Sequence, residues 1–216
     1  MTSTKENGIS GSDIRAKLKH PVVDADGHMV ETTFAILDFV KKVGGTKIAL
    51  KYESYLKANS SAPGRRAIWV GNSGPATIDR ATAMLPKLYK KRLDEAGIDF
   101  GIVYGTQALS VLRIGDDEMR PVIYRAMNTM YADMFNDLSY RLTPAALIPM
   151  HKPNEAIDEL EFVVNKLNLK AIVMNTQIQV PAPEVLSEAP HLAKYSMAPT
   201  SPAIDQGDRY DRVWKK

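Results

Sequence analysis

The sequence has 216 residues, of which 44% are apolar and 25% are charged, a composition typical of a globular protein and not of a disordered chain. Cysteine is absent, which excludes disulfide bonds and thiolate metal sites. The net charge of +3 arises from basic residues scattered among acidic ones, so we expect no nucleic-acid partner. No apolar run could span a membrane and residues 1–19 lack an apolar signal segment, so we expect no membrane partner and a cytoplasmic location.

The first third of the chain is predicted to hold one strand and several helices. Residues 1–20 are polar and are expected to form a loose N-terminal arm. Residues 21–26 are short, apolar and β-branched, which predicts a buried strand. An insertion at residues 31–79 is expected to hold one or two helices and the stretch NSSAPGRR. A helix at residues 85–96 then ends at Gly97, a residue typical of a left-handed C-terminal cap.

Three further apolar runs do not alternate with polar residues, which favours strands buried on both faces of a parallel sheet. Helical periodicity separates these runs. The strands are expected at residues 100–106, 145–150 and 170–175, and the helices at residues 116–138 and 153–167. Strands and helices therefore alternate along the chain, which predicts an α/β fold whose four strands pair in parallel, in chain order.

Two features of the later chain complete this outline. The stripe of methionines in the helix at residues 116–138 is interpreted as core packing and not as a cofactor site. Residues 181–207 are expected to form a proline-rich loop, and YDRVWKK, from Tyr210, begins another amphipathic helix.

The stretch VVDADGHMVE, residues 22–31, places ionisable side chains at the end of the first strand. Because side chains alternate along a strand, Asp24, Asp26 and His28 are expected on one face, at the carboxyl end, where α/β folds bind ligands. A carboxylate and an imidazole two residues apart can bind one divalent cation, and Gly27 between them lets the backbone approach closely. The alternative is a turn with a surface histidine, since DADG is also typical of turns.

Four segments resemble one protein family. VVDADGHMVE is similar to the first-strand signature of the amidohydrolase-related family of metal-dependent hydrolases and decarboxylases, which fold as distorted TIM barrels. RLDEAGIDFGIVYGT resembles the entry to that family's second strand, and RLTPAALIPMHKPNEAIDELEFVVNKLNLKAIVM resembles its third and fourth strand–helix units. GDRYDRVWKK is similar to the start of the helix after strand four. The resemblance implies that residues 21–216 form a partial, half (β/α)8 barrel, with strands 1–4 and an insertion after strand 1.

The resemblance also implies a metal site. Asp26 and His28 would occupy the two first-strand metal positions, and the ion would be zinc or manganese. A carboxylate at the first position favours the decarboxylase branch of the family. Asp24 has no ligand role in the family pattern and is expected either to be structural or to contact the ligands, while Glu31 is expected to contact the surroundings of the ligands. The family completes its site with a histidine after strand five and an aspartate after strand eight, so we expect an incomplete site in this chain.

Polar residues at other strand ends are candidates for binding a substrate. They are Thr106, His151 and Asn175, and position at the carboxyl end of a strand is what indicates them. For His151 the alternative is a polar loop residue. His20 precedes the first strand and His191 lies in the proline-rich loop, so neither is expected to bind the metal. No catalytic residue is assigned.

The leading hypothesis is that the chain is the N-terminal part of a metal-dependent hydrolase or carboxy-lyase (decarboxylase), inactive as this fragment, whose parent acts on a small carboxylate-containing substrate. The ion would orient the carboxylate in decarboxylation, or lower the pKa of bound water in hydrolysis. The alternative is a non-catalytic half-barrel binding or assembly module that covers its open sheet edge by self-association as a homo-oligomer. A nucleotide-binding doubly wound fold is disfavoured because no glycine-rich phosphate loop follows any strand.

Overall fold

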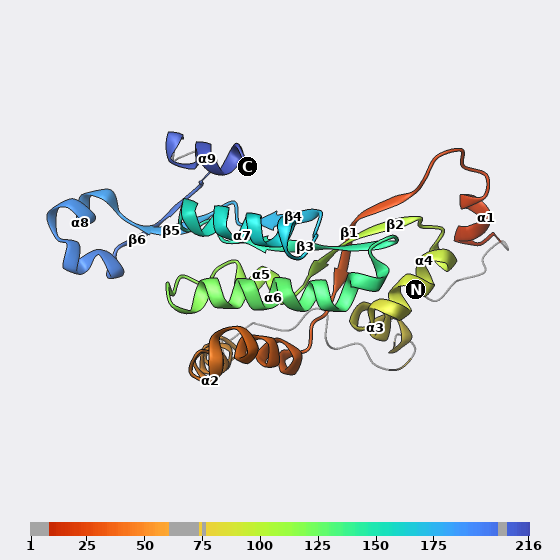
Figure 1. The fold of residues 1–216 in the computed structure, drawn as a ribbon, viewed down its shortest axis with the longest axis horizontal. Coiled ribbons are helices and arrows are strands. Elements are labelled where there is room, and N and C mark those ends of the chain that lie inside the picture. The colour runs from red at the N-terminus through yellow and green to blue at the C-terminus, as the bar shows by residue number, and fades with distance from the viewer. Residues whose placement is uncertain (1–8, 61–73, 75–76, 203–206) are drawn as a thin grey trace.

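The fold is built on a four-stranded parallel sheet with the order β1-β2-β3-β4. A computed structural model provides the structure and describes residues 9–60, 74, 77–202 and 207–216. The strands are β1 (Val23–Met29), β2 (Phe100–Gly105), β3 (Leu142–Ile148) and β4 (Ala171–Met174) (Figure 1). The parallel pairing in chain order confirms the predicted α/β half-barrel, whose outermost strands are β1 and β4.

Helices separate the strands much as the periodicity predicts. They are α2 (Thr33–Ser60), α3 (Thr77–Met84), α4 (Pro86–Ala96), α5 (Ala108–Val111), α6 (Met119–Phe135), with the 3₁₀ turn η2 (Asn136–Leu138) after it, and α7 (Pro153–Asn165). Gly97 caps α4 with φ 73°, as expected for a left-handed C-terminal cap. Within the stretch NSSAPGRR, residues 61–66 lie outside the described residues. None of the helices in the described part of the chain combines the length and hydropathy needed to cross a membrane.

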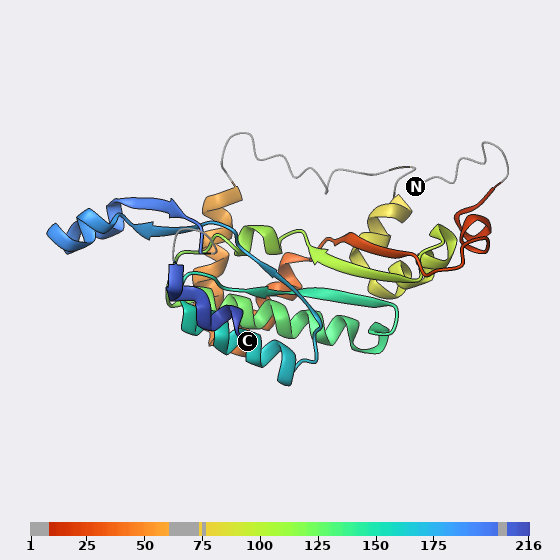
Figure 2. The same ribbon diagram turned by 90° about the horizontal axis from the view of Figure 1, so that it is seen from above.

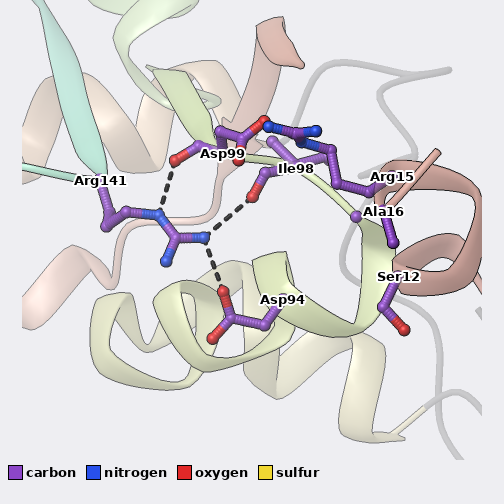
Figure 3. Close-up of a pocket in the computed structure, with 8 residues that line it drawn as sticks. Ser12, Arg15, Ala16, Asp94, Ile98, Asp99 and Arg141 are labelled. Atoms are coloured by element: carbon purple, nitrogen blue, oxygen red, sulfur yellow. Dashed lines mark hydrogen bonds and ion pairs between the residues drawn. The ribbon is translucent and has the colours of Figure 1, made fainter. Parts of the chain in front are cut away.

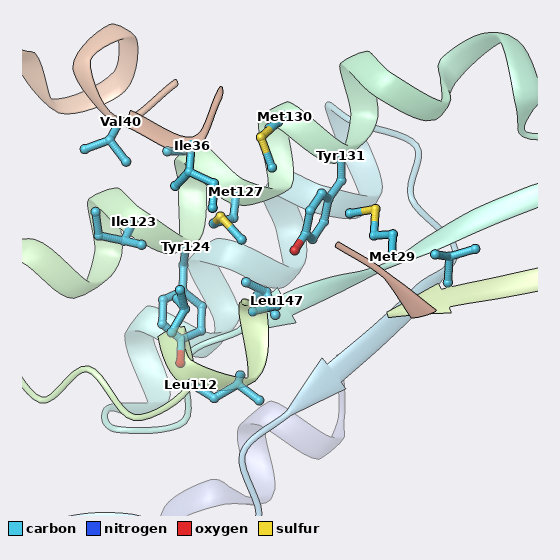
Figure 4. Packing of buried hydrophobic residues seen from close by; sticks show 14 of the residues in the cluster. Met29, Ile36, Val40, Leu112, Ile123, Tyr124, Met127, Met130, Tyr131 and Leu147 are labelled. Carbon is cyan, nitrogen blue, oxygen red and sulfur yellow. The ribbon is translucent and has the colours of Figure 1, made fainter. Parts of the chain in front are cut away.

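The main core lies between the sheet, α6 and α2. Met127 and Met130 are fully buried there, between α2 residues such as Ile36 and the sheet, and Tyr131 points toward Met29 of β1 (Figure 4). The methionine stripe is therefore core packing, as predicted. A second, smaller core joins β3 to α7 and to Tyr210, whose hydroxyl donates a 2.6 Å hydrogen bond to the Met150 carbonyl.

Two segments are more ordered than the sequence predicts. The expected loose arm contains a short helix, α1 (Gly11–Arg15), which begins with a Ser10–Asp13 capping box and packs against α4. The expected proline-rich loop forms an arm that extends away from the sheet (Figures 1 and 2). Its elements are β5 (Ile178–Pro181), α8 (Pro183–Glu188), η3 (Pro190–Tyr195) and β6 (Met197–Thr200), followed by η4 (Gly207–Tyr210) and α9 (Asp211–Trp214) outside the arm. Pro183 and Pro190 begin helices, where a missing N–H costs no hydrogen bond, so these two prolines do not prevent regular structure.

Candidate metal site at the end of the first strand

Asp26 and His28 lie together at the carboxyl end of β1. The His28 Nε2 and Asp26 Oδ1 atoms are 3.8 Å apart, and the Asp26 side chain is 93% exposed whereas that of His28 is 30% exposed. The imidazole is also tilted against the ring of Tyr104 on β2, with the ring centroids 6.2 Å apart. The strand end therefore brings the two predicted ligands within reach of one another.

A β-bulge changes which side chains share a face of β1. Asp24 pairs with Gly101 and Gly27 with Val103, so three steps along β1 correspond to two steps along β2. A side chain added at Gly27 would lie 2.5 Å from the Tyr89 hydroxyl and 3.4 Å from Asp24 Oδ2, which places Asp24 on the side that faces α4.

His28 pairs with Tyr104 of β2, and the two rings lie close together on the opposite face of the sheet from Asp24. The expectation that Asp24 shares a face with His28 is therefore wrong, because the extra residue reverses the alternation. Asp24 Oδ1 accepts a 3.0 Å hydrogen bond from the Asp26 backbone N–H, within the bulge itself. Burial raises the pKa of Tyr89, and the negative charge of Asp24 adds to that shift.

The donor atoms at this strand end suit a divalent metal ion. Carboxylate oxygen and imidazole nitrogen bind zinc or manganese at about 2.0–2.2 Å, so two ligands of one ion lie at most about 4.4 Å apart. The 3.8 Å separation between Asp26 and His28 fits this limit. Among the residues that the structure describes, no group of three histidine, aspartate or glutamate side chains could hold a metal ion. The described chain thus offers two donors, fewer than the three protein ligands of a typical catalytic zinc.

Glu31 is buried three residues beyond His28, with 4% of its surface exposed. Its carboxylate accepts a 2.6 Å hydrogen bond from the Tyr131 hydroxyl and bonds of 2.9 and 3.3 Å from the backbone N–H groups of Gln107 and Ala108. These contacts join the end of β1 to the start of α5 and to α6. Sequence reasoning missed Tyr131 as part of this region; the signal was a tyrosine in a buried apolar stripe, whose hydroxyl needs a partner.

The three candidate substrate residues all follow strands at the carboxyl end of the sheet. Thr106 donates its backbone N–H to the Met29 carbonyl at 2.9 Å, and its hydroxyl is buried with no hydrogen-bond partner among the described residues. The Asn175 side-chain amide donates to the Leu112 carbonyl at 2.9 Å, so one of its two N–H groups is used within the chain. Their contact with a substrate stays a prediction.

His151 lies beside a buried arginine. Burial lowers the pKa of His151 to about 4, and the positive charge of Arg120 acts in the same direction, so the imidazole is neutral at pH 7. Arg120 is 1% exposed and donates two hydrogen bonds to Glu155, of 2.8 and 2.9 Å, and one of 2.6 Å to Asp117. The Nδ1 atom of His151 is buried and has no hydrogen-bond partner within the described part of the chain.

The other two histidines lie away from the candidate metal site. His20 is exposed before β1, with its Nδ1 atom 3.1 Å from the Pro21 carbonyl oxygen. His191 is exposed in η3 of the arm.

A pocket of about 470 Å³ opens at the opposite, amino end of the strands (Figure 3). Arg141 donates there to the Asp99 carbonyl at 2.6 Å, the Ile98 carbonyl at 2.9 Å and the Asp94 carboxylate at 2.7 Å. The Arg15 guanidinium pairs with the Asp99 carboxylate and, with the Val22 backbone N–H, lowers the pKa of Asp99. These contacts join the segments that precede β1, β2 and β3. The pocket is separate from the candidate metal site.

The four parallel strands and the helices between them form half of a (β/α)8 barrel, with Asp26 and His28 close together at the end of its first strand. Known structures share this fold. A 2,6-dihydroxybenzoate decarboxylase from Rhizobium aligns with a TM-score of 0.54 and 18% identity, over 91% of this chain and 46% of that one. A dihydroxybenzoic acid decarboxylase from a Polaromonas species, solved with manganese and the inhibitor 2-nitroresorcinol, aligns with a TM-score of 0.54 and 17% identity over the same shares.

The present chain therefore spans less than half the length of the structures that it matches. No protein-family model and no curated protein sequence matches it. The structural likeness supports the predicted family resemblance at the level of the fold.

Proposed function

We propose that the chain is the strand 1–4 portion of a metal-dependent carboxy-lyase whose substrate is a small aromatic carboxylate. The observation that carries the proposal is the Asp26–His28 pair, 3.8 Å apart at the carboxyl end of the first barrel strand. The solved decarboxylases of the same fold support it, since one of them holds manganese. Hydrolysis of a related substrate is the second reaction that a metal at this position could serve.

The residues of this chain would bind and orient the reactants. A divalent ion held by Asp26 and His28 would supply positive charge for a substrate carboxylate and a neighbouring oxygen. His151, neutral at pH 7, could accept or donate a hydrogen bond without adding charge. The described residues supply two metal ligands, so we expect weak metal binding and no turnover from the 216-residue chain alone.

A metal-content measurement tests the proposal. The chain and its His28→Ala and His20→Ala variants are dialysed against Mn²⁺ or Zn²⁺, and bound metal is measured by mass spectrometry. The wild type and His20→Ala should retain similar amounts of metal, because His20 lies before the strand, whereas His28→Ala should lose it. Equal retention by His28→Ala and the wild type would contradict the proposed site. Turnover is followed in parallel with dihydroxybenzoates, and appreciable turnover would show that further ligands lie within the chain, with His151 the first to test.

A second candidate function is a non-catalytic assembly module. The arm favours it, because large apolar side chains on its surface are exposed, among them Leu186 (52%), Leu192 (46%) and Tyr195 (76%). Ile172 on the outer strand β4 is also 39% exposed. Light scattering coupled to size-exclusion chromatography tests this function: a stable dimer that dissociates in a Tyr195→Ser variant supports it, and a monomer contradicts it.

A further inference from the structure

The end of β1 is tied to two other elements by contacts that surround Glu31. Besides the three hydrogen bonds that its carboxylate accepts, the Glu31 backbone carbonyl accepts a 2.7 Å bond from the Gln107 side-chain amide. Gln107 thus binds both the side chain and the main chain of Glu31. We call Glu31, Gly105, Gln107, Ala108 and Tyr131 the Glu31 cluster.

The hydrogen-bond donors of the cluster keep the Glu31 side chain in one position. Tyr131 is fully buried, and both its burial and the negative charge of Glu31 raise the pKa of Tyr131 well above its ordinary value, so the hydroxyl remains a donor. A buried carboxylate is stable only when hydrogen bonds replace the water that it loses. The three donors to Glu31 provide this replacement, which fixes the carboxylate in one position.

Gly105 leaves the space in which this arrangement fits. A Cβ atom at Gly105 would lie 2.0 Å from the Tyr131 hydroxyl oxygen and 2.1 Å from Glu31 Oε1, far inside contact distance. Any side chain at this last residue of β2 would therefore displace the Tyr131–Glu31 hydrogen bond. The glycine is required for the close approach of the two groups.

The cluster is joined to the candidate metal pair through Met29. Met29, between His28 and Glu31 in sequence, pairs with Gly105 across β1 and β2, and its carbonyl accepts the Thr106 N–H at 2.9 Å. Movement of Glu31 would therefore loosen the strand pairing that sets the direction of His28. Metal ligands depend on such supporting contacts for their orientation, and the loss of one typically costs about 10–100-fold in metal affinity.

We infer that Glu31 is a positioning residue for the metal pair: with Tyr131 and Gln107 it holds the end of β1 so that the His28 imidazole faces the Asp26 carboxylate. The inference rests on the proposed function, because it presumes that Asp26 and His28 bind a metal. It assigns no metal contact to Glu31, whose carboxylate is occupied by its three donors.

Mn²⁺ affinity, measured by electron paramagnetic resonance, tests the inference on the 216-residue chain. Tyr131→Phe should weaken Mn²⁺ binding about tenfold, the lower end of the effect of supporting contacts. Tyr124→Phe is the matched control, because Tyr124 lies on the same helix and its buried hydroxyl has no hydrogen-bond partner in the described residues. Its affinity should equal that of the wild type. Affinities are compared under conditions in which circular dichroism shows every variant to be fully folded.

Two further readouts separate positioning from a general effect on stability. Glu31→Gln keeps one acceptor oxygen, which can accept from Tyr131 and Ala108 at the Oε1 position or from Gln107 at the Oε2 position, so it should keep part of the affinity that Glu31→Ala loses. Amide exchange at Thr106 should be faster in Tyr131→Phe, since that N–H reports the pairing of the strand ends. Unchanged Mn²⁺ affinity in Tyr131→Phe and Glu31→Ala, with binding abolished by His28→Ala, would overturn the positioning role alone. Affinity that His28→Ala leaves unchanged would overturn the proposed function with it.

Discussion

The side chain of Asn128 hydrogen-bonds the backbone of β3 on the side where β2 no longer pairs with it. Its removal should lower the free energy of unfolding. β2 and β3 pair only as far as Val103 and Pro144, so the backbone of Leu147 pairs with Val173 of β4 on one side and lies beyond the pairing with β2 on the other. Asn128 on α6 accepts the Leu147 N–H at 2.7 Å and donates to the Leu147 carbonyl at 2.9 Å. It also donates to the buried carboxylate of Glu159 at 2.8 Å. One amide thus satisfies three buried groups.

The Asn128→Ala variant leaves both backbone groups of Leu147 without a partner. Each buried group left unsatisfied costs about 1–3 kcal/mol, so we expect the free energy of unfolding to fall by about 3 kcal/mol or more. With a urea m-value of about 2 kcal/mol per molar, the midpoint of unfolding should fall by roughly 1.5 M.

Urea unfolding followed by circular dichroism measures this change. Thr129→Ala is the control: the neighbouring hydroxyl only bonds the Arg125 carbonyl of its own helix, and its loss should change stability by less than about 0.5 kcal/mol. A loss below about 1 kcal/mol in Asn128→Ala would refute the reasoning that this amide replaces a missing strand neighbour.

Three further predictions concern the charged groups around the sheet. Arg120→Met should lower the free energy of unfolding by about 3 kcal/mol, because it removes the buried cation beside the Glu155 carboxylate and leaves the half-exposed Lys152, 3.8 Å away, as the remaining one; a loss under about 1 kcal/mol in urea unfolding would contradict this. The unfolded state binds a proton on His151 near pH 6.5 and the folded state only near pH 4, so stability should fall as the pH drops through this window. His151→Gln should show a weaker fall in melting temperature over the same window, and an unchanged slope would argue against a neutral, buried His151. Arg141→Met should lower the free energy of unfolding by about 1–2 kcal/mol, because it loses the hydrogen bonds to the Asp99 and Ile98 carbonyls before β2. A melting temperature equal to that of the wild type would show that those bonds add nothing to stability.

Local patterns predicted most of the fold. The helix that ends at Gly97 and the order of the parallel strands follow from periodicity, a positive-φ glycine and the alternation of strands with helices. The proline-rich segment was misjudged because Pro183 and Pro190 stand at helix starts, where proline is compatible with a helix, a position that composition alone does not reveal.

The candidate site was predicted only in part. Asp26 and His28 are close because they are two positions apart in sequence, with only Gly27 between them, which a local pattern can capture. The bulge that turns Asp24 away depends on pairing with β2, and the Tyr131–Glu31 bond joins residues 100 positions apart. Neither feature has a local sequence signal, since each exists only once distant segments have packed together.

Anomalous diffraction at the manganese edge, from crystals of the chain grown with Mn²⁺, tests the central claim most directly. We expect an anomalous peak within about 2.3 Å of the His28 Nε2 atom and of an Asp26 carboxylate oxygen. Crystals of the His28→Ala variant, grown in the same solution, should lack that peak. A well-ordered manganese ion elsewhere in the chain, with the Asp26–His28 pair empty at saturating Mn²⁺, would contradict the claim that this strand end is the metal site of a decarboxylase-type half-barrel.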